Sequence, residues 1–277
     1  LFVILAKSEK PVLLLLDEVP ILVNQIVKGE DYQITAERRR VANEFMSWLR
    51  KNSLEHQGKV RIVISGSIGF EPVLHQAGLS ATINNFTPFE LKPWPEDIAV
   101  GCLRALGREN GLTYRDGAET QMVRLLGCCI PHHVQMFFTH AEEYCRRRGD
   151  MTLKAEDAVL VYQTEMLSTR GHAELTHYED RLKLILGPER MPLALDLLTE
   201  AAVSGTLTRA AIRKLQKDYS FPDGATGEIQ RDILQILEHD GYLMQSSDGY
   251  RFVSRLLCDW WKSRYQNFFT PVAERGE

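Results

Sequence analysis

Two adjacent carboxylates, Asp17 and Glu18, follow directly after an apolar run at 12–16. Such a run without alternation predicts a strand buried on both faces, as in the centre of a parallel sheet. Ligands of these sheets bind beyond the carboxyl ends of the strands. An aspartate there can hold Mg²⁺, usually through water, and a neighbouring glutamate can polarise water for attack on a γ-phosphate. The alternative is a solvated acidic turn after a buried strand.

A second apolar strand is predicted at 60–64, and it ends in the sequence Ser-Gly-Ser. Between the two strands, the spacing of apolar residues predicts a loop at 28–35 and a helix over 36–51. Strand, helix and strand form a βαβ unit, whose handedness makes the strands parallel with both carboxyl ends at one edge. The helix carries the triplet Arg38 to Arg40, which we interpret as a solvated face rather than as an arginine finger.

Ser67 is therefore expected to meet Asp17 and Glu18 in one crevice. A small polar side chain in that place can hydrogen-bond a γ-phosphate or the attacking water. The sequence leaves a second interpretation equally open, in which Ser67 caps a helix that begins near Glu71.

Composition limits the classes of protein that the chain can represent. Its 277 residues, 44% of them hydrophobic, can form two or three modules. The net charge of -4 gives no overall attraction to nucleic acid or to an anionic membrane. Five cysteines without a C-x-x-C pair favour a reducing compartment, and no apolar run reaches membrane length. These features predict a soluble, cytoplasmic protein.

The sequence contains no phosphate-binding loop of the form G-x-x-x-x-G-K-[ST]. Its only Gly-Lys pair is Gly58-Lys59, with Ser53 in place of the first glycine and Val60 in place of the final Ser or Thr. In P-loop proteins that loop precedes the strand with the acidic pair. The sequence is therefore expected to be a fragment whose N-terminal portion has been lost.

The runs LLLLDEVP, RIVISGSIGFEPVL and GLSATINNFTPFELKPW resemble the bacterial and archaeal branch of the STAND-type P-loop ATPases, relatives of AAA+ proteins. The resemblance covers nearly the whole chain. It implies an α/β fold, with a partial parallel P-loop NTPase sheet followed by an all-helical lid and a C-terminal winged helix. It also implies an ATP-binding and ATP-hydrolysing switch, in which Asp17 of the Walker B motif holds Mg²⁺, Glu18 is catalytic and Ser67 acts as sensor 1.

In this family the segment after the sheet is the lid, and helices are predicted here at 95–110, 117–126 and 131–148. The family's lid carries a Gly and Pro motif that packs against the nucleotide base, and Pro131 in LLGCCIPHHVQMFF matches its proline. The same residue also has a purely structural explanation, because proline is favourable at the first position of a helix. The expected domains are 1–92, 93–170 and 171–277, for the ATPase core, the lid and the winged helix.

The same run offers a metal site as a rival interpretation, because it contains Cys128, Cys129, His132 and His133. Tetrahedral zinc sites take paired ligands from separated segments. Neighbouring residues on one turn cannot all point at one ion, and Pro131 interrupts them. We therefore favour buried cysteines at a helix start.

The remaining chain has the pattern of a winged helix-turn-helix. The predicted elements are helices at 178–186, 192–204, 209–217 and 225–239, followed by strands at 242–245 and 250–253. Asp248-Gly249 is the turn signal between the two strands. The final segment YRFVSRLLCDWWKSRY is aromatic enough to be a docking helix.

Charge decides between partners of the winged helix. The expected recognition helix, 225–240, has one cation against four anions, and the chain from Gly171 onward has 13 Lys and Arg against 16 Asp and Glu. DNA affinity depends on cations that displace counterions. The sequence therefore favours a protein partner or an autoinhibitory role over DNA, and oligomerisation is possible. The missing phosphate loop supports a second hypothesis, a winged-helix regulator or interaction scaffold that hydrolyses nothing.

Overall fold

A computed structural model describes residues 1–219 and 226–275 of the chain, without the side chains of 169–172 and 226. The chain forms two compact units. Unit 1 comprises Leu1–Phe89, Arg181–Met191 and Glu228–Asp240. Unit 2 comprises Glu90–Asp180, Pro192–Gly227 and Gly241–Glu277.

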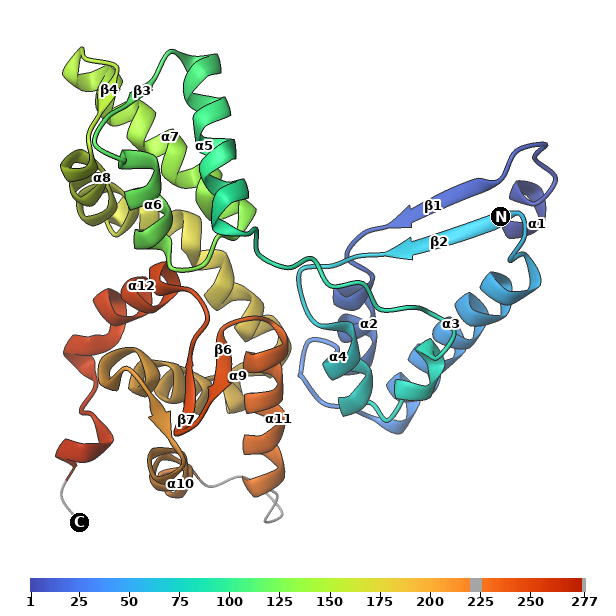
Figure 1. Cartoon of the computed structure of the whole chain (residues 1–277). Helices are drawn as coiled ribbons and strands as arrows, with labels where there is room; N and C mark the ends of the chain where they lie inside the picture. Colours follow the sequence, from blue (N-terminus) through green and yellow to red (C-terminus); the bar gives the residue numbers. More distant parts are fainter. Residues whose placement is uncertain (220–225, 276–277) are drawn as a thin grey trace. The chain divides into compact units, whose positions relative to one another are not determined.

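Unit 1 is built on two parallel strands, β1 (Val12–Leu16) and β2 (Val60–Ile64), as the sequence predicts (Figure 1). Its helices from the first part of the chain are α1 (Phe2–Leu5), α2 (Val19–Lys28), α3 (Ala36–Glu55) and α4 (Phe70–Gln76), with a 3-10 turn at Ser80–Ile83. The predicted crossover helix is thus present as α3. Thr35 caps it, since its side chain accepts a hydrogen bond from the backbone N–H of Arg38.

One face of this sheet forms a core and the other face is open. Leu14 and Leu16 pack on one side with a buried cluster of Phe2, Leu49 and Val60. On the other side Leu13 is 58% exposed, Leu15 71% and Val63 50%. The prediction that the first strand is buried on both faces is therefore wrong for this chain. Side chains alternate between the faces of a strand, and here the helices cover only one face.

Lys28 is the last residue of α2 and is buried, so the prediction that a loop begins at this residue is wrong. Its Nζ donates a hydrogen bond to the backbone oxygen of Ile185. Burial lowers the pKa of Lys28 to about 7, and the nearby Arg190 acts in the same direction, while Asp232 opposes them. Asn24, one turn earlier on α2, donates to the backbone oxygen of Leu184 at 3.0 Å. Two side chains of α2 thereby hold the same stretch of backbone.

Unit 2 begins with a bundle of helices whose bounds match the predicted ones closely. These are α5 (Glu96–Asn110), α6 (Ala118–Leu126) and α7 (Pro131–Arg148), followed by α8 (Ala155–Val161) and a π-helical turn at Tyr162–Met166. The short parallel strands β3 (Thr113–Tyr114) and β4 (Thr152–Leu153) join the bundle at one end. Leu103, Met122 and Phe137, one from each of the first three helices, are fully buried.

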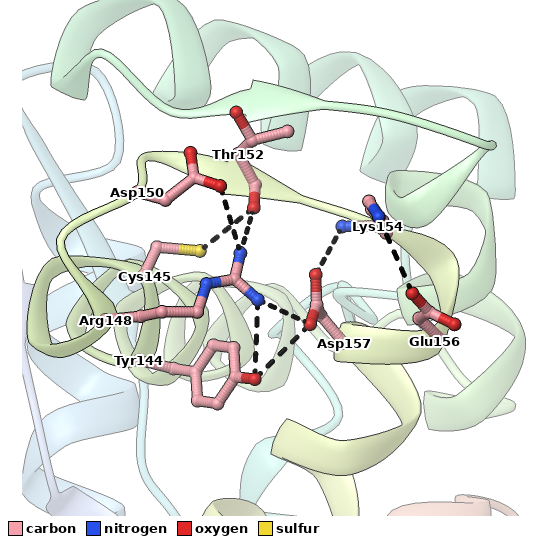
Figure 2. Close-up of polar contacts among 8 residues, drawn as sticks. All are labelled: Tyr144, Cys145, Arg148, Asp150, Thr152, Lys154, Glu156 and Asp157. Carbon is pink, nitrogen blue, oxygen red and sulfur yellow. Dashed lines mark hydrogen bonds and ion pairs between the residues drawn. The ribbon is translucent and has the colours of Figure 1, made fainter.

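The end of α7 is fastened to the start of α8 by one carboxylate, that of Asp157 (Figure 2). Asp157 accepts from Arg148 at 2.7 Å, from the hydroxyl of Tyr144 at 3.3 Å and from the backbone N–H of Lys154 at 2.9 Å. Arg148 also donates to the backbone oxygen of Thr152. Although partial burial opposes it, this set of donors lowers the pKa of Asp157.

The rest of the described chain has α9 (Thr169–Ser204), β5 (Leu207–Thr208), α10 (Arg209–Lys217), α11 (Thr226–His239), β6 (Leu243–Ser246), β7 (Gly249–Phe252) and α12 (Arg255–Tyr265). Two 3-10 turns follow, at Gln266–Phe268 and Val272–Glu274. The three strands form an antiparallel sheet in the order β5-β7-β6. The predicted hairpin is present, and it pairs Ser246 with Gly249.

Three predicted features of this part need comment. The helices predicted at 178–186 and 192–204 belong to one element, α9, which contains a non-helical residue at Gly187 and also runs through Gly171. Ala225, the predicted start of the next helix, lies outside the described residues. The domain limits at 92 and 170 stay predictions.

The prediction that the last helix is a docking helix is wrong for its tryptophans. Trp260 and Trp261 of α12 are fully buried and stack edge to face, with ring centroids 5.3 Å apart. The indole N–H of Trp261 donates to the hydroxyl of Thr199 on α9 at 3.3 Å. Trp260 and Trp261 therefore belong to the core of unit 2.

In the part of the chain that the structure describes, no helix is both long and apolar enough to cross a bilayer.

Gly187 should be irreplaceable. Its φ of +70° and ψ of 178° are open essentially only to glycine, and an added Cβ would lie 2.7 Å from the ring of Tyr32. We expect Gly187→Ala to lower the free energy of unfolding by about 2–3 kcal/mol in urea denaturation. Gly101→Ala is the control, because a Cβ on this α5 residue meets open space. It should leave stability equal or raise it by up to about 1 kcal/mol. Equal losses in both variants would contradict this assignment.

Lys28 should make stability depend on pH. The unfolded chain binds its proton up to about pH 10.5, whereas the folded chain releases it near pH 7, so stability should rise with pH between these values. We expect Lys28→Met to stabilise the protein most at pH 7 and below. The advantage should shrink toward pH 10 by at most about 1.4 kcal/mol per pH unit. The exposed Lys10 provides the control, and Lys10→Met should change stability at pH 7 by no more than about 0.5 kcal/mol.

Candidate functional site

The carboxyl ends of β1 and β2 lie level, because Leu16 pairs with Ile64 in the parallel register. The backbone N–H of Ser65 then donates to the backbone oxygen of Leu16 at 2.9 Å, which continues the ladder by one residue. This places Ser65 beside Asp17, and its hydroxyl donates to Asp17 Oδ1 at 2.7 Å. The same Oδ1 accepts the backbone N–H of Glu18 at 3.0 Å. The acidic pair and the serine loop thus start from one sheet edge.

Glu18 is held in an uncommon conformation and points toward the second strand. Its φ of 57° and ψ of 25° are left-handed, and it stands at the N-cap of α2. Few residues other than glycine, asparagine and aspartate adopt this region. Glu18 Oε2 accepts two hydrogen bonds from Ser67, one from the backbone N–H and one from the hydroxyl, both at 3.0 Å. An unusual backbone conformation therefore brings the two predicted site residues into direct contact.

The structure brings Asp17, Glu18 and Ser67 together as the sequence analysis expects. The alternative interpretation of Ser67 as a helix cap is wrong, because α4 begins with Gly69 at its N-cap and has no side-chain cap. The hydroxyl of Ser67 is used by Glu18 instead. The chemical roles of the three residues remain predictions.

Gly66 allows the two loops to approach each other. A Cβ at this position would lie 2.7 Å from Cδ and 2.8 Å from Cγ of Pro20, and 3.5 Å from Glu18 Oε2. The Pro20 ring therefore packs directly against the backbone of Gly66, next to the hydrogen bonds of Ser67. Ser65 and Gly66 are not among the site residues expected from the sequence. Their position directly after an apolar strand was the available signal.

The oxygen atoms at this edge suit a hard divalent cation. Among the described residues, both hydrogen bonds to the Asp17 carboxylate go to Oδ1, which leaves Oδ2 without a hydrogen bond. Asp17 and Glu18 are exposed and Ser67 is half-buried, so solvent and ligands reach the edge. Carboxylate and hydroxyl oxygens are the donors that Mg²⁺ prefers. The residues therefore fit the ion that the resemblance implies.

The serine loop has a second attachment within unit 1. The backbone N–H of Gly69 donates to Asp240 Oδ1 at 2.9 Å, and His239 Nδ1 lies 3.2 Å from the same oxygen. Asp240 directly follows the end of α11. The loop that carries Ser67 is thus bonded at one end to Glu18 and at the other to the end of α11. The contact joins residues 171 positions apart, and no sequence pattern indicates it.

Pro131 lies in unit 2, where it is the first residue of α7. The structure agrees with the helix-start explanation of this proline, and its role toward a nucleotide stays a prediction. The neighbouring His133 is buried, and its Nε2 lies 3.1 Å from the hydroxyl of Tyr178. Burial lowers the pKa of His133 to about 3, so this imidazole is neutral. Burial also raises the pKa of the Cys128 thiol.

The rival metal site finds no support in the geometry. Within 1–219 and 226–275, no group of three or more His, Cys, Asp or Glu side chains is arranged to hold one ion. The Cys128 and Cys129 thiols are free. His133 is engaged by Tyr178.

Comparison with known proteins places the fold. A Walker-type ATPase of Pyrococcus abyssi superposes with a TM-score of 0.59 at 16% identity, over 91% of this chain. The chain spans 63% of the length of that ATPase. The RuvB Holliday junction branch migration motor of Thermotoga maritima aligns with 90% of this chain and 70% of its own, at 10% identity and a TM-score of 0.43. No protein-family model matches the sequence, and no curated protein matches it significantly. The fold is mixed α/β and similar to that of a Walker-type ATPase.

Proposed function

We propose that this chain is part of an ATP-binding, ATP-hydrolysing switch of the STAND type. The observation that carries the proposal is the contact between Glu18 and Ser67 beside Asp17, at the carboxyl edge of a parallel sheet. In α/β sheets this edge is where ligands bind. The fold likeness to a Walker-type ATPase supports the same class of activity.

Asp17 holds Mg²⁺ in this proposal, usually through water, with Oδ2 as the free carboxylate oxygen. When bound, the ion neutralises charge on the β- and γ-phosphates. Glu18 polarises the attacking water and takes up its proton. Ser67 contacts the γ-phosphate, and Pro131 transmits the nucleotide state to the lid at 93–170.

The hydrogen bonds to Glu18 suggest how nucleotide could control the base. Ser67 directs both its N–H and its hydroxyl at the one carboxylate oxygen, Oε2. A carboxylate that accepts two hydrogen bonds has fewer lone pairs available for a proton from water. A γ-phosphate offers the same donors a more highly charged acceptor. In the proposed switch, ATP draws Ser67 away from Glu18 and thereby frees the base.

The bond between Gly69 and Asp240 extends this proposal toward the C-terminal part of the chain. Gly69 lies two residues after Ser67, so displacement of Ser67 would strain the contact with the end of α11. The segment 171–277, which we propose to be a winged helix, would receive the signal by this route. A protein partner is the proposed recipient of the switch.

The 277 residues alone should bind ATP poorly, because they contain no phosphate-binding loop and most phosphate contacts come from that loop. We expect isothermal titration of this chain with ATP and Mg²⁺ to give no micromolar affinity. Micromolar binding would show that phosphate is held by residues other than the proposed ones.

Glu18→Gln should slow hydrolysis in a protein that carries both this chain and a phosphate-binding loop. Removal of the base should lower the turnover of ATP by about 10²–10⁴ while ATP stays bound. Glu9→Gln, an exposed change before the amino end of β1, serves as the control and should leave turnover unchanged. Unchanged turnover in Glu18→Gln would show that Glu18 is not the base. Absence of turnover in the unaltered protein would favour the second hypothesis, a winged-helix regulator or scaffold without hydrolysis.

A further inference from the structure

Clusters of basic residues occur on three helices, and on two of them the structure explains most of the charges. At the end of α7 every arginine has a carboxylate partner, in the pairs Arg146–Glu142, Arg147–Glu165 and Arg148–Asp157. On α3 the partners are Asp31 for Arg38, and Glu37 and Glu44 for Arg40. These charges are neutralised within the molecule. They leave little attraction for an external anion.

On α10, three basic residues have no carboxylate partner among the residues that the structure describes. Arg209, Arg213 and Lys217 are exposed and follow one another at i, i+4 and i+8, so they form a row along one face of the helix. No carboxylate in the described part of the chain pairs with any of the three, and α10 itself contains no acidic residue. Four residues of helix rise by about 6 Å, so the row presents a cation at about every 6 Å. We call these three residues the α10 basic row.

The fold does not need this row. Helix α10 is held by Ala211, Ile212 and Leu215 on its opposite, buried face, and Thr208 caps its start through a bond to the Ala211 N–H. Like charges at i, i+4 cost about 0.2–0.5 kcal/mol per pair. A cation in the first turn, such as Arg209, also opposes the helix dipole. Of the three, only Lys217, in the last turn, is placed favourably for the helix dipole. Arg209 and Arg213 therefore do not stabilise the helix, which points to a role outside the fold.

A depression lies at one end of the row and a further cation lies near the other. A shallow, open depression of about 430 Å³ is lined by Arg213, Gln216, Lys217 and Tyr219. At the other end of the row, Arg251 of β7 is exposed, and its Nε donates to Thr206 Oγ1 at 3.1 Å. Thr206 precedes Arg209 by three residues. Arg251 thus extends the line of cations beyond the start of α10.

We propose that the α10 basic row binds the phosphate backbone of a nucleic acid, without reading its sequence. Rigid guanidinium groups suit phosphate oxygens, and a regular row of cations suits a regular polyanion. An acidic protein is a poorer fit, because protein interfaces have an apolar core and the larger apolar side chains of α10 are buried. The acidic charges that disfavour DNA lie on α11 and across the segment from Gly171 onward, which carries 13 Lys and Arg against 16 Asp and Glu. The structure assigns the contact to α10 and the β7 strand instead.

The proposal is independent of ATP hydrolysis and can be tested on this chain. Fluorescence anisotropy would follow binding to a labelled DNA duplex and to a labelled RNA at several salt concentrations. If the row and Arg251 neutralise three to four phosphates, the logarithm of the binding constant should fall with the logarithm of the salt concentration with a slope of about -3 for duplex DNA. DNA and RNA share the phosphate chemistry, so the two arms distinguish which one the row prefers. A failure to bind either would overturn the proposal.

Arg213→Ala/Lys217→Ala is the decisive variant. It should reduce the magnitude of the salt slope by about 2 and weaken binding to every sequence alike, by about tenfold or more. Arg108→Ala, at the exposed end of α5, is the matched control and should change little. Arg213→Lys/Lys217→Arg keeps both positive charges and should retain binding. It therefore tests the role of the charges even if the double alanine variant folds poorly. Equal losses in the control, or tighter binding to polyglutamate than to nucleic acid, would contradict the assignment.

Discussion

The parallel register of β1 and β2 is the constraint on which the site depends. Leu16 opposite Ile64 ends both strands at the same level, and each strand delivers its polar residues to the same point. A slip of two residues would keep every side chain on its face but would separate Glu18 from Ser67 by about 6–7 Å. The hydrogen bonds between the acidic loop and the serine loop would then be lost. The apolar face with Leu14 and Leu16 fixes the register by packing on the helices.

Much of this arrangement could be predicted from local sequence. The apolar runs predicted the positions of the two strands, and the handedness of a βαβ unit predicted that they are parallel. It follows that the carboxyl ends of both strands lie at the same edge of the sheet. The helices α5, α6 and α7 also appeared at nearly their observed bounds, since caps and spacing are local signals. The convergence of Asp17, Glu18 and Ser67 needed only these rules.

What escaped prediction depends on contacts between distant segments. Lys28 looked like the first residue of a polar loop, and only the backbone of Ile185, 157 positions away, explains its burial. Trp260 and Trp261 looked like a surface for docking, but Thr199 and the core of unit 2 receive them. The helix predicted at 178–186 ends just before Gly187, but no local signal indicates that Gly187 meets Tyr32. In each case the sequence shows only the type of residue, whereas its burial depends on a contact with a residue that is distant in the sequence.

The open face of the two-stranded sheet has a consequence for the behaviour of the chain in solution. Leu13, Leu15 and Val63 face water, but each is partly covered, so complete burial would stabilise each by about 1–2 kcal/mol. In the described chain both outer edges of this sheet are also without a neighbouring strand. Unpaired strand edges and an exposed apolar face together form a template on which a strand of another molecule can add to the sheet. A net charge of only -4 on 277 residues provides weak mutual repulsion. The open face of Leu13, Leu15 and Val63 therefore favours self-association of the chain at high concentration.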